Sequence, residues 1–161
     1  MKTESLCAEG ALAVRRFREG DLPELAALLA DPEVMRWLEP PFDRARAAEF
    51  LRVAGLSEPP LIYAAEEDGA FLGYVIFHRY GGEEAAELGW VLRRSAWGRG
   101  YAGRLTALLL SAAEGKWAEA VIECAPEQRA SARVAEKLGF REEGMADGCR
   151  IFRRAVTQDG T

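Results

Sequence analysis

The stretch WGRGYAG, Trp97 to Gly103, carries the strongest signal in the sequence. Its glycines spell G-x-G-x-x-G, the pattern with which dinucleotide-binding folds place a pyrophosphate at a helix N-terminus. In those folds the first glycine follows its strand almost directly, and several strand-helix units come after it. Here the five residues RRSAW separate Leu92 from Gly98, and only one further helix-strand alternation fits before the chain ends. The sequence therefore disfavours a dinucleotide site, and the lack of a following Gly-Lys-Ser or Gly-Lys-Thr excludes a P-loop.

Small residues in this stretch leave successive peptide N–H groups exposed where an amphipathic helix is expected to begin, at about Gly100. Such N–H groups, together with the positive end of a helix, bind anions. We therefore expect a ligand that carries phosphate. A second interpretation stays open, in which the glycines only allow a tight turn between a strand and a helix.

Composition indicates one soluble globular domain. The chain has 161 residues, of which 49% are hydrophobic and 29% charged, and its mean hydropathy is -0.15. It has no apolar run near the ~18 residues that a membrane span needs and no signal-peptide core. A net charge of -5 argues against a nucleic-acid surface, and three scattered cysteines fit a reducing cytoplasm. We expect a single domain over residues 1–161 with a core at about 12–156, in the cytoplasm, with no membrane or nucleic-acid partner.

Hydrophobic periodicity and turn signals predict an α+β chain. Strands are expected at 12–17, 61–67, 70–78, 85–92 and 119–125, with a closing pair within 140–156. Helices are expected from Asp21, from Asp31 through a short segment to Leu38, over about 43–54, over about 100–114 and over 130–138. The order is therefore one strand, a helical block, three antiparallel strands, and then helix, strand, helix and two strands.

A resemblance to a known family emerges from three separated motifs. WGRGYA resembles motif A of the GNAT superfamily of acetyl-CoA-dependent N-acetyltransferases, in the form that the RimJ/RimL-like branch often shows. Trp97 stands in a slot that is usually Gln or Arg, Gly100 in the invariant glycine slot and Ala102 in the last. The stretches ADPEVMRWL (30–38) and SARVAEKLGFREEG (131–144) are similar to that branch's early helix and motif B. The resemblance implies a mostly antiparallel sheet of about six to seven strands flanked by about four to five helices, with a splay between the fourth and fifth strands.

The resemblance implies that acetyl-CoA is the cosubstrate and that no metal takes part. The pantetheine arm would pair with the backbone of Trp90, Val91 and Leu92, as a peptide adds to a sheet edge. Backbone N–H groups over 97–102, from Trp97, Gly98, Arg99, Gly100, Tyr101 and Ala102, would bind the pyrophosphate. Arg99 and Arg94 would add positive charge, unless they are simply solvated. Gln128 takes the place of an asparagine that holds pantetheine in the family.

Transfer to an amine requires a group that accepts the proton of the amine, because an alkylammonium has no lone pair. Glu87 is the expected base, since strand alternation puts it on one face with Gly89 and Val91 and similar family members carry a glutamate there. A solvated or paired surface carboxylate is the alternative role for Glu87. His78, the only histidine, is a second candidate base, and Tyr80 and Tyr63 are weaker ones.

The departing thiolate needs a proton donor. Many GNAT enzymes use a tyrosine at the slot that Ala135 occupies here, so that role is excluded for this chain. Ser131 matches a serine that lies near the sulfur in the RimL-like branch, although a serine in a first helical turn can instead bond only to backbone. Backbone N–H groups around Val91 are the expected donors to the thioester oxygen. An acyl-cysteine on Cys124 is disfavoured, because no histidine neighbours it in sequence.

The acceptor is expected to be a primary amine, either a protein N-terminal α-amine or a small molecule, and the protein to be a monomer or homodimer. Trp37, Phe42, Tyr63, His78 and Tyr80 are candidates to line its entry, or else belong to the core. A CoA-binding sensor or assembly module without catalysis is the alternative function, favoured by the departures at Ala135 and Gln128.

Overall fold

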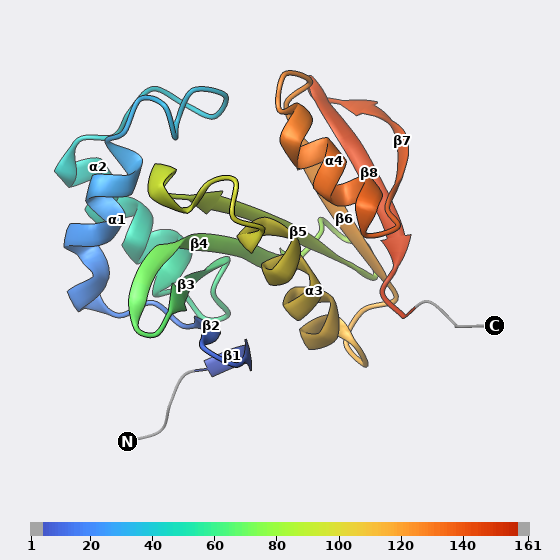
Figure 1. Cartoon of the computed structure of the whole chain (residues 1–161), viewed down its shortest axis with the longest axis horizontal. Helices are drawn as coiled ribbons and strands as arrows, with labels where there is room; N and C mark the ends of the chain where they lie inside the picture. The colour runs from blue at the N-terminus through green and yellow to red at the C-terminus, as the bar shows by residue number, and fades with distance from the viewer. Residues whose placement is uncertain (1–4, 158–161) are drawn as a thin grey trace.

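A computed structural model describes residues 5–157 and shows one sheet of eight strands (Figure 1). The strand order across the sheet is β1-β2-β3-β4-β5-β6-β8-β7, and every neighbouring pair is antiparallel except β5 and β6. The strands are β1 Ser5–Glu9, β2 Leu12–Arg15, β3 Ile62–Glu67, β4 Ala70–Arg79, β5 Ala85–Leu92, β6 Glu119–Cys124, β7 Arg141–Ala146 and β8 Cys149–Ala155.

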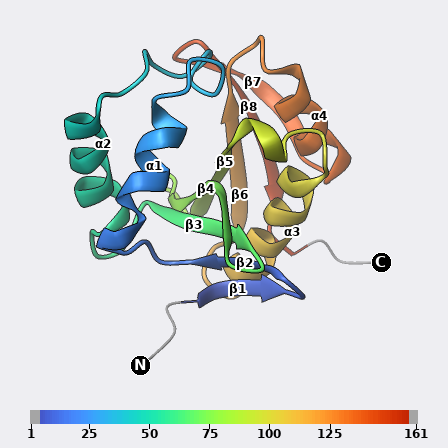
Figure 2. The same cartoon turned by 60° about the vertical axis from the view of Figure 1, so that its left-hand side comes forward.

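Four α-helices cover the sheet, two on each face (Figure 2). They are α1 Leu22–Leu29, α2 Arg44–Phe50, α3 Tyr101–Ala113 and α4 Arg129–Lys137, with 3-10 turns at Glu19–Asp21 and Arg94–Ala96 and a π-helical turn at Leu51–Gly55. Leu25 of α1 and Ala47 of α2 belong to one buried cluster, whereas Leu105 of α3 and Ala135 of α4 belong to another. The sheet thus separates the two larger hydrophobic cores, and a third, small cluster contains Ala85, Val121 and Ile151. No helix within residues 5–157 is long and apolar enough to cross a membrane.

The side chains of strand β5 alternate between the two larger cores. Leu88 and Leu92 pack in the cluster under α3 and α4, and Val91 packs in the cluster under α1 and α2. Because side chains alternate along a strand, Glu87 and Gly89 share the α1/α2 face with Val91, as the sequence predicts.

Within residues 5–157, the one parallel pair of strands is also where the sheet opens. Pairing of β5 with β6 is restricted to Ala85–Glu119, Ala86–Ala120 and Glu87–Val121, although β5 continues to Leu92 and β6 to Cys124. The splay that was expected between the strands 85–92 and 119–125 is therefore confirmed, as is the mixed, mostly antiparallel α+β architecture.

Two expectations about secondary structure are wrong. Strand β1 was not predicted, and it makes the sheet one strand larger than expected by pairing with β2. The predicted helix from Asp31 to Leu38 is a series of turns, with a hydrogen bond from Met35 N–H to Asp31 O and another from Leu38 N–H to Met35 O. Helices in proteins depend on the burial of an apolar stripe. Here only Met35 is buried, whereas Trp37 and Leu38 are 41% and 44% exposed, so that stripe is missing.

Candidate active site

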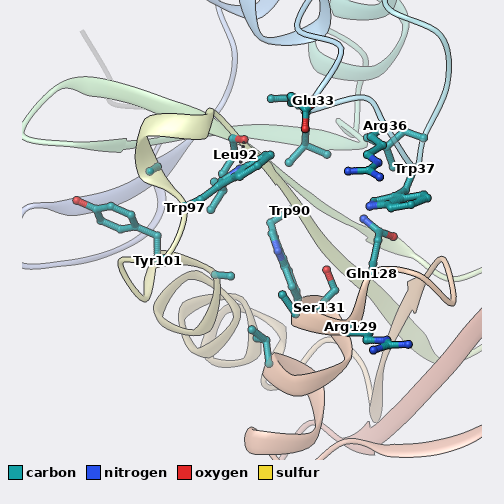
Figure 3. A pocket seen from close by; sticks show the side chains of 18 of the residues that line it. Glu33, Arg36, Trp37, Trp90, Leu92, Trp97, Tyr101, Gln128, Arg129 and Ser131 are labelled. Carbon is teal, nitrogen blue, oxygen red and sulfur yellow. Dashed lines mark hydrogen bonds between the residues drawn. The ribbon is translucent and has the colours of Figure 1, made fainter.

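A pocket with a volume of ≈ 560 Å³ lies where the sheet opens. Its walls are the end of β5, the loop and first turn of α3, the first turn of α4 and the turns at 33–38. Figure 3 shows Trp90 in the middle of the pocket, with Trp97 and Tyr101 on one side and Gln128 and Arg129 on the other. This volume is in the range of pockets that enclose a cofactor or drug-sized ligand.

The loop before α3 presents a run of unpaired peptide donors. Trp97 N–H donates to Arg94 O at 3.0 Å, but the peptide N–H groups from Gly98 to Gly103 have no protein acceptor among residues 5–157. Gly98 and Gly100 have φ of 71° and 82°, a conformation that favours glycine. A Cβ atom at Gly98, Gly100 or Gly103 would meet nothing within 4 Å. The loop is therefore open to a ligand, and its donors suit a phosphate. The run of free donors was expected over residues 97–102. It covers 98–103 instead, because the N–H of Trp97 is already bonded to Arg94 O.

The side chain of Trp97 fixes this loop to the strand. Its indole Nε1–H donates to Leu92 O at 2.8 Å, across the turn that contains Arg94–Ala96. The Tyr101 hydroxyl on the next turn donates to Glu67 on β3. Both aromatic residues thus hold the start of α3 against the sheet while their neighbours line the pocket.

The hydrogen-bond phase of β5 decides which peptide groups face the splay. Tyr80 N–H donates to Ala85 O, and Arg93 N–H donates to Leu72 O, at the two ends of a β4–β5 ladder without register shifts. In an antiparallel ladder the bonded residues alternate. Odd-numbered residues of β5 therefore direct their peptide groups at β4, and Trp90 and Leu92 direct theirs into the splay.

This phase changes one expectation. Trp90 and Leu92 offer backbone donors and acceptors to a ligand, except that Leu92 O already accepts from Trp97. The peptide groups of Val91 face β4 instead. Val91 was expected to pair with pantetheine and to donate to the thioester oxygen. This residue lines the pocket, but its peptide groups bond to β4 and are not available for either role.

The first turn of α4 brings Gln128 and Ser131 into the pocket. Gln128 Oε1 accepts from Ala125 N–H at 2.8 Å, so the carbonyl of this amide caps its own loop, and its Nε2 has no protein partner among residues 5–157. The Ser131 hydroxyl likewise forms no hydrogen bond with the described part of the chain. The alternative in which Ser131 bonds only to helix backbone is therefore not seen. Ala135 is fully buried under the sheet.

Glu87 lies at the vertex of the splay, at the last β5 position that pairs with β6, and it is not part of the pocket wall. His78 is its cross-strand neighbour on β4, and His78 Nε2 lies 3.5 Å from Glu87 Oε1. Burial raises the pKa of Glu87, the charge of Glu123 raises it further, and that of His78 opposes the rise. A carboxylate with a raised pKa is better matched to proton transfer near neutral pH.

Among the other candidate bases and acceptor contacts, only some lie near this region. Tyr80 donates to Glu123 Oε2 at 2.6 Å, and this bond raises its pKa to about 12. Tyr63 and Phe42 are buried in the two cores. Trp37, by contrast, is exposed in the pocket wall. Cys124 is buried, and burial raises its pKa, so it is a poor nucleophile.

The arginines differ from expectation. Arg94 forms an ion pair with Asp31 at 2.8 Å, which ties its turn to the end of α1, and Arg99 lies over the Tyr101 ring outside the pocket wall. Arg36 and Arg129 line the pocket instead, and neither was predicted. The same holds for Glu33, Val34, Leu38 and Val134. The stretch 30–38, which carries part of the family resemblance, was the sequence signal that could have pointed to Glu33, Val34, Arg36 and Leu38.

Comparison with known proteins places this geometry in a family context. The model of the acetyltransferase (GNAT) domain matches residues 11–141. The uncharacterized N-acetyltransferase YnaD of Bacillus subtilis (strain 168) is 27% identical over 142 residues, which cover 86% of this chain and 84% of that protein.

Solved structures share the fold. A GNAT-family acetyltransferase from Bacillus anthracis superimposes with a TM-score of 0.83 at 23% identity, over 93% of this chain and 98% of that one. RimL, described as a ribosomal L7/L12 alpha-N-protein acetyltransferase in complex with coenzyme A, gives a TM-score of 0.81 at 20% identity, over 94% of this chain and 98% of that one.

Proposed function

This chain belongs to the GNAT acetyltransferase family and is an N-acetyltransferase, and we propose that it moves the acetyl group of acetyl-CoA to a primary amine by direct attack in a ternary complex. One observation carries the proposal. The unpaired N–H groups from Gly98 to Gly103 and the unpaired edge of β5 border the same pocket. A ligand with a diphosphate at one end and an extended amide-containing arm fits both features.

Coenzyme A would bind along this line. Its diphosphate would accept from the N–H groups of Gly98 to Gly103, and its pantetheine arm would pair with Leu92 N–H and Trp90 O. The amide nitrogen of Gln128 would reach the arm from α4. The acyl end would then point down β5 toward the vertex at Glu87.

The chemistry begins with a neutral amine. As its nitrogen attacks the thioester carbonyl, a C–N bond forms and Glu87 accepts the proton of the nitrogen, directly or through one water. Negative charge then develops on the thioester oxygen. Trp90 N–H faces the splay and lies nearer along β5 to Glu87 than Leu92 N–H does, so it replaces Val91 as the proposed donor to this oxygen.

Collapse of the intermediate breaks the C–S bond. The Ser131 hydroxyl, which is open to the pocket and has no protein partner within residues 5–157, would donate to the departing thiolate. The buried, high-pKa Cys124 makes an acyl-cysteine route unattractive, so direct attack is the simpler scheme.

The acceptor would approach from the α1/α2 face, because Glu87 lies on that face and the turns at 33–38 pack into the same core. The name of RimL describes an enzyme that acetylates a protein α-amine. We propose a protein N-terminus or a small primary amine as the acceptor of this chain.

A panel of amines tests this function. Release of free CoA thiol from acetyl-CoA would be measured with N-terminal peptides, polyamines and amino-sugar compounds. The proposal is supported if one class of amine is acetylated and if Glu87→Gln loses this activity while its affinity for CoA is unchanged. Tight CoA binding without turnover of any amine would favour the non-catalytic CoA-binding module, which the alanine at 135 and the engaged Gln128 carbonyl also suit.

A further inference from the structure

The ring of His78 is held in one tautomer by its own strand. Its Nδ1 lies 2.7 Å from Arg79 O. A carbonyl oxygen only accepts hydrogen bonds, so Nδ1 must carry the proton. In a neutral ring, Nε2 then has a lone pair and no proton.

This lone pair faces Glu87. His78 Nε2 and Glu87 Oε1 are 3.5 Å apart, with the two side chains 26% and 23% exposed. With neutral imidazole and ionised carboxylate, two acceptors would face each other. One added proton converts this contact into a favourable one, either as carboxylic acid and imidazole or as carboxylate and imidazolium. The two side chains can therefore share one added proton.

The groups around the pair are known from each neighbouring strand. Tyr80 on β4 and Glu123 on β6 form a hydrogen bond beside it, and Arg153 on β8 lies over the Tyr80 ring at 5.9 Å. Burial raises the pKa of Cys149 on β8, and the nearby charges of Glu123, Asp147 and Glu87 raise it further. The negative charge of Glu123 favours a proton on the pair, and the Tyr80 hydroxyl, already bonded to Glu123, does not compete for it.

We propose that His78 is a positioning residue that shares the proton taken by Glu87 during acetyl transfer and passes it to solvent. This inference rests on the proposed function, with Glu87 as the base. The amine nitrogen loses its proton to Glu87 as the C–N bond forms, and the new Glu87 O–H donates to His78 Nε2. The C–S bond breaks afterwards, and the thiolate takes a proton from water, directly or through the Ser131 hydroxyl, which water then reprotonates. One proton thus leaves to solvent and one returns from it, so the number of protons balances.

A test without any acceptor is possible because His78 is the only histidine in the chain. In untagged protein labelled with ¹⁵N-histidine, the ring nitrogens give one set of signals, which report tautomer and titration. We expect the Nδ1–H tautomer in the neutral ring, and an Nε2 signal that moves in Glu87→Gln, because this variant removes the carboxyl group 3.5 Å from Nε2. The Nε2–H tautomer, or an Nε2 signal that is the same in both proteins, would overturn the inference whatever the enzyme's activity.

Kinetics test the same point with an acceptor from the amine panel. His78→Ala should lower kcat at pH 7 by roughly tenfold to hundredfold, at the lower end of a general acid–base contribution, with the KM for acetyl-CoA unchanged. The acid limb of its pH profile should move to higher pH, because the charge of His78 lowers the pKa of Glu87. Added imidazole should restore part of the rate in His78→Ala but not in Glu87→Gln. The inference about His78 would be overturned, and the proposed function would not, if His78→Ala kept the wild-type pH profile or if imidazole restored none of its lost rate at any pH. Absence of turnover in the wild-type protein across the panel would contradict the proposed function as well.

Discussion

Gly73 on β4 approaches Val91 on β5 so closely that a Cβ atom at Gly73 would stand 2.1 Å from Val91 O. Its φ is 147°, which side chains rarely allow. The position lies directly across from the end of β5, where Gly73 pairs with Leu92 and the strand leaves β6. The close approach of β4 therefore holds the peptide groups of Val91 on its own side and leaves those of Trp90 and Leu92 to the splay.

Gly73→Ala should destabilise the protein by ~2–5 kcal/mol, because it combines backbone strain with a clash against backbone atoms. Chemical denaturation measures this. Gly82→Ala is the matched control, since Gly82 has no positive φ and open space around its Cβ position. It should change stability by no more than about 0.5 kcal/mol. Equal stability of the two variants would show that β4 and β5 are not in such close contact.

Gly103 separates ligand binding from folding. It lies within α3 with ordinary helical geometry, and its Cβ position is open toward the pocket. Gly103→Ala should raise stability by about 0.5–1 kcal/mol, because glycine is a poor helix residue. Gly103→Leu should also fold but should weaken CoA binding by about tenfold or more in a calorimetric titration. Unchanged CoA affinity in the leucine variant would mean that the diphosphate binds elsewhere. Gly100 is less suitable for this purpose, because its φ of 82° strains any substitution.

Trp97→Phe should loosen the loop while it keeps most of the aromatic surface. The variant removes the Nε1–H donor to Leu92 O, a hydrogen bond of about 1 kcal/mol. We expect a small drop in melting temperature and a several-fold loss of CoA affinity. Trp37→Phe is the control in the same pocket, because the Trp37 indole donates to no acceptor within residues 5–157. Its CoA affinity should be less affected, and equal losses in the two variants would argue against the role given to the indole hydrogen bond.

The raised pKa of Glu87 makes a prediction about stability and pH. A carboxyl whose pKa is raised in the folded state contributes stability below its unfolded value, near ~4.3, and loses that contribution as pH rises through the folded value. Glu87→Gln should therefore be more stable than the wild type at pH 8 and similar to it at pH 4, even though the proposed function predicts that it loses activity.

Asp21→Asn should show the opposite trend. Burial raises the pKa of Asp21, but hydrogen bonds from Arg15 and from Arg18 N–H outweigh burial, and the net shift is downward. This substitution should cost stability at pH 8 and much less at pH 3. The melting temperatures of both variants would be measured across this pH range. The same pH dependence in both would contradict a raised pKa for Glu87.

Local sequence signals predicted the parts of this fold that depend on neighbours in the chain. The WGRGYAG loop, the helix that follows it, the three-strand block and the splay all follow from glycine positions, alternation or the family resemblance. The segment 31–38 was misjudged because its capping signals, Asp31 and Pro32, are local, whereas the burial that would sustain a helix is decided by distant contacts. Strand β1 was missed for the same reason, since it exists by pairing with β2.

The candidate site shows the same division. Most of the expected positions on the loop and the strand line one pocket, whereas Arg99 and Glu87 lie outside its wall. Side-chain partners were not predictable when they come from far along the chain. Arg94 bonds to Asp31, 63 positions away, and Glu123 receives a hydrogen bond from Tyr80, 43 positions away. The contact between His78 and Glu87 depends on the register between β4 and β5. The sequence predicted that these two strands are antiparallel, but it did not predict their register.

A crystal structure of the complex with coenzyme A tests the central claim most directly. The account predicts diphosphate oxygens within hydrogen-bond distance of the peptide N–H groups between Gly98 and Gly103, and pantetheine paired with Trp90 rather than with Val91. A diphosphate held by side chains outside this loop, or an arm that does not run along β5, would contradict it.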